Sequence, residues 1–200
     1  MINRLEAKCS GYIFCKSDFY TVLDIIDERQ KFEFSSGINE IRGEIDSGIF
    51  AISFLLSMHE KVDSRLLAIP PTIVVDEKEM LISDFQSYSC YMDSSYKLFS
   101  SSKSVEELVS KGLKTSKLAY SSNDICDMFN MENFRFKQPI KAVGNERFRA
   151  MAAIGFSYGK SVFCFPWMSR RRFDSFSGHL TDTLQTLRSL NKISIVPIGY

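Results

Sequence analysis

The stretch Gly43-Glu44-Ile45-Asp46-Ser47-Gly48-Ile49-Phe50 decides how the rest of the sequence is interpreted. Its two glycines have the G-x-x-x-x-G spacing of a phosphate-binding loop. In such a loop the second glycine is followed by a Lys that reaches the β- and γ-phosphates and by a Ser or Thr that holds Mg²⁺. Here those two places hold Ile49 and Phe50, which offer neither a donor nor a metal ligand. The stretch therefore predicts the frame of a nucleotide site without its chemistry.

The charges of the loop and the residues around it support this interpretation. Glu44 and Asp46 place two carboxylates where a triphosphate would add its own negative charge. Residues 39–42 form a short extended segment before the loop. A helix buried on most of its circumference is expected after the loop, from the apolar residues Phe50, Ile52, Phe54, Leu55 and Met58.

The composition is that of one globular domain. The chain has 200 residues, of which 44% are hydrophobic and 24% charged. A net charge of +1 gives no general attraction to nucleic acid or to an acidic membrane. The sequence starts without an apolar signal segment, and its longest apolar stretch, residues 49–58, is far shorter than the ~18 residues of a membrane span. Five scattered cysteines without a C-x-x-C pair predict reduced thiols in a cytosolic protein.

Residues 72–77 allow two interpretations. Pro70-Pro71 is expected to end the preceding segment, and Thr72-Ile73-Val74-Val75 then forms a strand followed by Asp76-Glu77. The same pattern occurs in a Walker B strand, which supplies a Mg²⁺-binding Asp and a catalytic Glu. We favour a solvated hairpin turn at residues 76–79, because the segment follows so soon after the first loop and helix.

The remaining sequence predicts helices followed by a parallel sheet. Ser104 and Glu107 form a capping box, and helices are expected through about Met131, broken at Gly112 and at residues 121–124. The last third then predicts a helix, a buried strand, a helix and a strand, at residues 146–157, 161–165, 173–190 and 193–197. This order is typical of a βαβ unit.

With its motifs in this order, the chain resembles the nucleotide-binding domain of ATP-binding cassette (ABC) ATPases over essentially its whole length. The transporter type fits better than the DNA-repair type, because no long coiled-coil insertion is present. The resemblance implies a single α/β domain over residues 1–200. It would have a P-loop NTPase-like (ABC ATPase) core with a mostly parallel sheet flanked by helices, N-terminal antiparallel strands, and a small helical lobe at roughly residues 88–140.

The resemblance also locates the family's motifs on this sequence. Walker A falls on residues 43–50, and the Q-loop glutamine is replaced by Asp93 or Ser94. The signature motif and its Arg-x-Arg tail fall on residues 142–149, where Gly144, Glu146 and Arg149 match and Asn145 takes a glycine position. Val143 replaces the serine that would bond a γ-phosphate across a dimer interface.

The Walker B strand falls on Val162–Phe165, so its metal-binding Asp and catalytic Glu are replaced by Pro166 and Trp167. No switch histidine follows the last strand, at residues 197–200. Without these groups nothing would neutralise the triphosphate or orient an attacking water. We therefore expect no hydrolysis and assign no cofactor; the residues leave open whether ATP with Mg²⁺ still binds.

Other candidate residues have ordinary structural interpretations. His59 and His179 are interpreted as helix residues, and residues 170–172, three arginines, as a solvated charge run. Trp167 either plugs the empty pocket or fills the core. A cluster of five apolar residues is interpreted as core, with a docking surface as the alternative: Met128, Phe129, Met131, Phe134 and Phe136.

The resemblance thus implies a catalytically inactive ABC-type subunit, the degenerate partner in a heteromeric ABC transporter. Its partners would be an active ABC ATPase subunit, a membrane permease, or a second copy in a homodimer; neither nucleic acid nor direct membrane insertion is expected. It would be cytoplasmic, peripheral at the inner face of the membrane through the permease. One alternative is a regulatory or scaffold module that uses the fold for dimerisation. Another is an enzyme rebuilt on Asp46, Asp76, Glu77 or Asp93.

Overall fold

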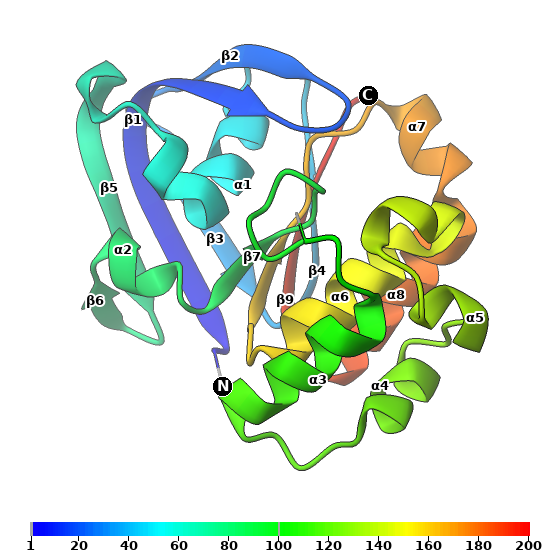
Figure 1. The fold of residues 1–200 in the computed structure, drawn as a ribbon. Helices are drawn as coiled ribbons and strands as arrows, with labels where there is room; N and C mark the ends of the chain where they lie inside the picture. Colours follow the sequence, from blue (N-terminus) through cyan, green and yellow to red (C-terminus); the bar gives the residue numbers. More distant parts are fainter. Residues whose placement is uncertain (1, 100) are drawn as a thin grey trace.

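The computed structural model describes residues 2–99 and 101–200, and Figure 1 shows two sheets with helices between and beside them. The first sheet has the strand order β2-β1-β5-β6, with β3 paired to β1. Its pairings are antiparallel. Its strands are β1 (Arg4–Lys16), β2 (Thr21–Ile26), β3 (Phe32–Ser35), β5 (Leu67–Val75) and β6 (Lys78–Met80).

The second sheet is parallel and has the order β4-β9-β8-β7. Because its strands run in one direction, their carboxyl ends meet at one edge, where ligands bind in open α/β sheets. The Gly43 loop, Met92, Phe165 and Gly199 follow these four strand ends. The strands are β4 (Gly37–Arg42), β7 (Ser89–Tyr91), β8 (Val162–Cys164) and β9 (Ile193–Ile198).

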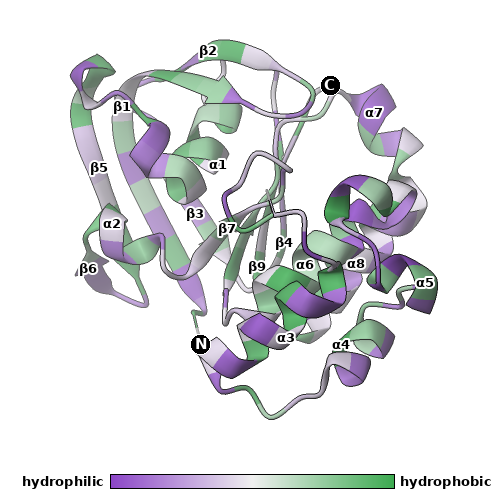
Figure 2. Cartoon of the chain, viewed as in Figure 1, coloured by the Kyte–Doolittle hydropathy of each residue, from purple (hydrophilic) through white to green (hydrophobic). Residues whose placement is uncertain are grey.

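Helix α1 (Ile49–Met58) lies between the two sheets, and it contacts β1 and β2 on one side and β7, β8 and β9 on the other. All ten of its residues are buried, which confirms the helix predicted from the apolar run. Figure 2 shows the same concentration of apolar residues in α1. Its two serines bond within the core: Ser57 donates to the Ser53 carbonyl at 2.8 Å, and Ser53 donates to Phe165.

The remaining helices form a lobe beside the parallel sheet, except for α2 (Ile82–Phe85), which contacts β5 of the antiparallel sheet (Figure 1). Helix α6 packs against both α3 and α8. The predicted capping box at Ser104 is confirmed, because its hydroxyl accepts from Glu107 N at 3.2 Å. The helices are α2 (Ile82–Phe85), α3 (Val105–Ser116), α4 (Ser122–Met128), α5 (Asn133–Phe136), α6 (Arg147–Ser157), α7 (Arg170–Ser175) and α8 (Ser177–Ser189).

Two predicted boundaries are wrong because of tertiary contacts. Helix α3 continues through Gly112, where a Cβ would lie 2.6 Å from Tyr158 Cδ2, so the glycine permits a close helix contact instead of a break. Strand β5 continues through Pro70-Pro71. It tolerates the prolines because its pairing with β1 is irregular there and β6 pairs only with residues 73–75.

The helix predicted over residues 173–190 is divided in two at Phe176, which has φ −100° and ψ 2°. The bend lets the Phe176 ring pack at 5.6 Å against Phe148 and at 5.0 Å against the Arg147 guanidinium. In the apolar cluster at residues 128–136, Phe129, Met131 and Phe136 are core as expected and Met128 is half-buried against them, whereas Phe134 is 62% exposed.

Residues 72–77 form the hairpin and not a Walker B strand. Asp76 and Glu77 occupy the β5–β6 turn with positive φ angles of 45° and 70°. The Asp76 carboxylate accepts from the backbone N–H groups of Asn3 and Arg4 at 3.0 and 2.9 Å. This turn belongs to the antiparallel sheet, so Asp76 has the structural role of a turn acceptor.

All five cysteines are free and buried. Among the described residues, no helix is long and apolar enough to cross a membrane.

Candidate functional site

The Gly43 loop joins β4 to α1 at the carboxyl edge of the parallel sheet, as a phosphate-binding loop does. Asp46 and Gly48 adopt left-handed backbone conformations, with φ 77° and 79°. A Cβ at Gly48 would also lie 2.7 Å from Gln30 Oε1. Gln30 in turn donates from Nε2 to the Ser47 carbonyl at 2.8 Å. The glycine frame is therefore used for a tight turn against the β2–β3 connection.

The two residues that replace the Lys and the Ser or Thr point into the core. Ile49 is 4% exposed and Phe50 is fully buried, within the apolar cluster that α1 forms with the two sheets. Both side chains therefore serve packing. Glu44 and Asp46 are exposed on the loop.

The carboxylate of Asp24 occupies the amino-terminal end of α1. Its Oδ1 accepts from Gly48 N at 3.1 Å and its Oδ2 accepts from Ala51 N at 2.8 Å. Asp24 comes from β2 and is fully buried. In a phosphate-binding loop, backbone N–H groups of this kind hold the phosphates, because the start of a helix favours an anion. The chain therefore supplies its own anion to the cradle.

Asp24 was missed by the sequence interpretation, although one local signal pointed to it. In β2 every second residue faces the interior, and Asp24 holds such a position before the buried Ile26. A carboxylate is almost never fully buried unless it has partners. An inward Asp in an apolar strand therefore indicates a buried cluster of donors, but not where those donors come from.

Trp167, at a position where the family has an acidic residue, covers the beginning of the same loop. Its indole Nε1 donates to the Gly43 carbonyl at 3.0 Å, and the residue is 4% exposed. The preceding Pro166 is buried as well. A Cβ at Gly199 would lie 2.8 Å from Trp167 Cζ2, so the backbone just after β9 packs closely against this ring. Beside it, Tyr200 N donates to Glu44 Oε1 at 2.9 Å.

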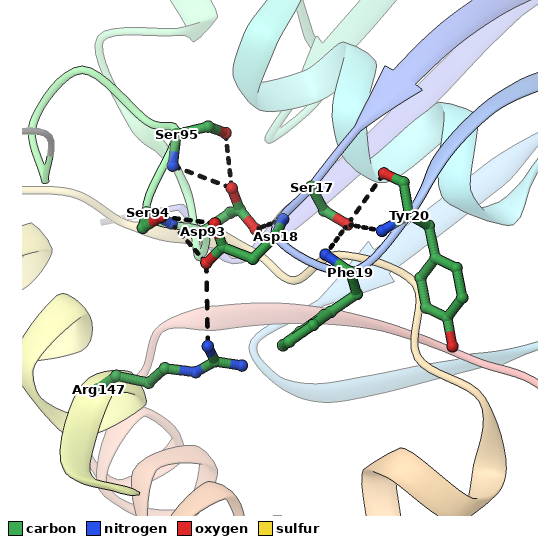
Figure 3. Close-up of polar contacts among 8 residues, drawn as sticks. All are labelled: Ser17, Asp18, Phe19, Tyr20, Asp93, Ser94, Ser95 and Arg147. Atoms are coloured by element: carbon green, nitrogen blue, oxygen red, sulfur yellow. Dashed lines mark hydrogen bonds and ion pairs between the residues drawn. The ribbon is translucent and has the colours of Figure 1, made fainter. Parts of the chain in front are cut away.

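Asp93 stands after β7 at the expected Q-loop position and is 1% exposed (Figure 3). Its carboxylate accepts from Asp18 N at 2.7 Å and from Ser95 N at 3.0 Å. Burial raises the pKa of Asp93, and these hydrogen bonds oppose the shift. The Asp18 carboxylate accepts from Ser94 N at 3.3 Å, and its Oδ2 lies 3.9 Å from Arg147 Nη1. The cluster ties the β1–β2 turn to the start of α6.

Two of the signature residues form contacts within the helical lobe. Glu146 is buried and accepts from Glu132 N at 3.3 Å, and Arg149 pairs with Asp182 and donates to the Asn130 carbonyl at 2.8 Å. Val143 is buried, whereas Gly144 and Asn145 are exposed. Across residues 2–99 and 101–200, no hydrogen bond or ion pair joins this motif to the Gly43 loop.

Among the described residues, no group of three or more His, Cys, Asp and Glu could hold a metal ion. The acidic candidates Asp46, Asp76 and Asp93 lie in an exposed loop, a hairpin turn and a buried cluster, respectively. Of the three consecutive arginines, Arg170 pairs with Asp174 at 3.1 Å and Arg172 stacks over Phe19 at 4.3 Å.

No protein-family model matches the chain, and no curated protein is significantly similar to it in sequence. Solved structures nevertheless share its fold. A Pyrococcus furiosus protein described as an ABC-transporter ATP-binding protein has a TM-score of 0.59 at 15% identity, over 98% of this chain and 90% of its own. The ATP-binding cassette MJ0796, solved as a dimer in a post-hydrolysis state with ADP and Pi, gives 0.61 at 9% identity, over 98% and 88%.

A bacterial Atm1-family ABC exporter with ATP bound gives a TM-score of 0.55 at 12% identity. The match covers all of this chain but 35% of the exporter. At these identities the likeness shows the fold alone, and that fold is the one of ABC ATPase domains. In this chain, the Asp24 carboxylate occupies the N–H groups at the start of α1.

Proposed function

We propose that this chain is a catalytically inactive ABC-type subunit, the degenerate nucleotide-binding-domain partner in a heteromeric ABC transporter complex. The observation that carries the proposal is the buried Asp24 carboxylate, which accepts from the Gly48 and Ala51 N–H groups. A phosphate in the same cradle would have to displace it or lie beside it. Two unit charges 4 Å apart repel by about 4 kcal/mol at an effective dielectric constant of about 20.

The neighbouring side chains of the loop provide neither a positive charge nor a metal ligand to offset this repulsion. Ile49 and Phe50 are buried in the core where a working loop has its Lys and metal ligand. Trp167, which stands where the resemblance expects an acidic residue, donates to the Gly43 carbonyl and contributes no oxygen ligand for a metal ion. These features support the loss of both phosphate binding and metal-assisted hydrolysis at this chain's own loop.

The exposed part of the signature motif supports a role beside an active partner. In ABC dimers of the resembling family, each ATP lies between the Walker A loop of one subunit and the signature of the other. Gly144 and Asn145 are exposed and could cover a partner's nucleotide. This cover would be weaker than in the family, because Val143 lacks the serine hydroxyl that would bond the γ-phosphate. Closure of such a dimer would reach a permease through the helical lobe.

The test of inactivity is an ATPase assay on the purified chain, together with a nucleotide titration with and without Mg²⁺. We expect no turnover above background. A Mg²⁺-dependent rate of about 1 s⁻¹ or more, a value within the range of working enzymes, that was lost on changing a residue of this site would overturn the proposal.

Capture of complexes from the native cells tests the partner. Co-purification of a permease and a second ABC subunit supports the transporter role. A soluble partner alone, with no permease, contradicts it and supports a regulatory or scaffold module built on the same fold.

A further inference from the structure

A cavity of about 470 Å³ lies at the opposite end of α1 from the Gly43 loop. Ser57, near the end of α1, lines it, together with Gln86 before β7 and Lys160 before β8. It therefore opens near the amino edge of the parallel sheet, whereas the phosphate cradle lies at the carboxyl edge. Its size falls within the range of about 300–1,000 Å³ that is usual for small-molecule sites.

Apolar and aromatic side chains from three segments form much of the wall. Tyr96 and Leu98 come from the segment after β7, Leu108 from α3 and Tyr158 from the end of α6. The Tyr96 hydroxyl is already used, because it donates to the Ser89 carbonyl at 3.2 Å. The ring of Tyr158 packs over Gly112, where no side chain interferes. The wall thus suits the apolar body of a ligand.

Positive charge dominates the polar lining. Lys97, Lys103, Lys111 and Lys160 line the cavity, against the single carboxylate of Glu60. That carboxylate already accepts from a neighbouring amide, Gln86 Nε2, at 2.8 Å. The cavity therefore has a surplus of cations around an apolar wall.

One of these lysines is held in place by the backbone. The Lys160 ammonium donates to the carbonyls of Gln86 and Ser87 at 3.1 and 2.8 Å. Burial lowers the pKa of Lys160, because the charged form loses hydration. A nearby anion would favour that charged form. Lys103 and Lys111, by contrast, are exposed at the rim, and the hydrogen bonds from Ser104, aided by the charge of Lys103, lower the pKa of the nearby Glu107.

We propose that this cavity binds a small organic phosphate with an aromatic or apolar body. A phosphate monoester carries about −1.5 to −2 charges at pH 7, which matches a site lined by several ammonium groups. Its apolar body would replace water against Tyr96, Leu98, Leu108 and Tyr158. A docked protein is a less suitable occupant, because a standard protein interface buries about 800 Å² on each partner, more surface than a site of small-molecule size offers. This site does not involve the Gly43 loop, so it is independent of the proposed loss of ATP hydrolysis.

The test is titration calorimetry of the full chain with phenyl phosphate, with phenol and inorganic phosphate as probes of the two halves. We expect phenyl phosphate to bind with a Kd at or below about 1 mM, and both halves to bind at least 10-fold more weakly. Binding should weaken with added salt, since charge contributes to it. Phenol binding as tightly as phenyl phosphate, or no binding of phenyl phosphate up to about 10 mM, would overturn the proposal.

Two variants of exposed lysines locate the site. Lys111→Glu should weaken phenyl phosphate binding at least 10-fold, because it reverses a charge at the rim. Lys114→Glu makes the same change on the same helix at an exposed residue that does not line the cavity, and should leave binding unchanged. Equal affinities of the two variants would place the ligand elsewhere and refute the assignment. Lys103→Glu, on the adjoining loop, provides a second rim variant should Lys111→Glu unfold.

Discussion

At the scale of single residues, the proposed inactivity depends most on Asp24. A helix start with unpaired N–H groups attracts anions, and this chain meets that demand internally. The Asp24 carboxylate also replaces a side-chain cap, because the N-cap residue Gly48 has none. The two carboxylate oxygens of Asp24 therefore cap α1 and accept from the N–H groups that, under the proposed function, no longer bind a phosphate.

Replacing Asp24 should separate these two effects. Asp24→Ala removes the cap and should lower the free energy of unfolding by about 1–2 kcal/mol. It also opens the cradle, so inorganic pyrophosphate should raise the Tm of Asp24→Ala but not that of the unchanged protein. Thermal denaturation followed by the fluorescence of Trp167, the single tryptophan, measures both effects.

The matched control is Glu28→Ala, which removes an exposed carboxylate just beyond the end of the same strand. It should show neither the stability loss nor the response to pyrophosphate. An identical pyrophosphate shift in all three proteins would mean that the anion binds away from the cradle.

At the scale of elements, the contact between α3 and α6 shapes the helical lobe. Gly112 lies against Tyr158 and Ser157, where a Cβ would approach the Ser157 carbonyl carbon to 2.9 Å. Propensity alone predicts a helix break at this glycine, because glycine costs about 1 kcal/mol relative to alanine. The tertiary contact explains why glycine stands there within a continuous helix.

This contact predicts that Gly112→Ala destabilises the protein despite its better helix propensity. Overpacking of this kind costs about 1–3 kcal/mol, since Tyr158 or the α6 backbone must move. Gly178→Ala is the control, because a Cβ at that position of α8 meets no atom within 4 Å. It should be neutral or stabilise by up to about 1 kcal/mol. Urea unfolding of both variants measures the difference, and equal stabilities would contradict the contact.

At the scale of the whole molecule, the two sheets pack around α1 and bury the thiols of Cys9, Cys15 and Cys164. Burial raises the pKa of Cys9 and of Cys164 to about 12 each. Between a pH near 9 and a pH near 12 the unfolded chain loses these protons while the folded chain keeps them. The unfolded state is then favoured, so these thiols make stability fall as pH rises through that window.

Urea unfolding at pH 9 and at pH 11 measures this fall in stability, and thiol chemistry checks the burial that causes it. Because the thiolate is the reactive form, the folded protein should react slowly with Ellman's reagent at pH 8, and urea should release five reactive thiols. Fast reaction of one thiol in the folded protein would show that its burial is not maintained in solution.

Much of the fold follows from local patterns in the sequence. The apolar run after Gly48, the capping box at Ser104 and the buried strand at residues 162–164 each have a short-range cause, and each is observed. The boundaries at Gly112, Phe176 and Pro70-Pro71 could not be predicted in this way. Close helix packing, ring contacts and an irregular strand pairing decide them, and these arise between distant segments.

The sequence by itself determined the order of the motifs and the absence of the Lys, the metal ligand and the catalytic acid. The sequence alone places Ile49, Phe50, Pro166 and Trp167 where the resemblance expects those groups. Only the tertiary structure decided which group accepts from the N–H groups at the start of α1, because Asp24 reaches Gly48 and Ala51 from the antiparallel sheet. It also decided that the Trp167 indole bonds Gly43 and that lysines from several segments surround one cavity. Such contacts depend on how the two sheets pack around α1 and how the lobe packs beside the parallel sheet, which no local pattern encodes.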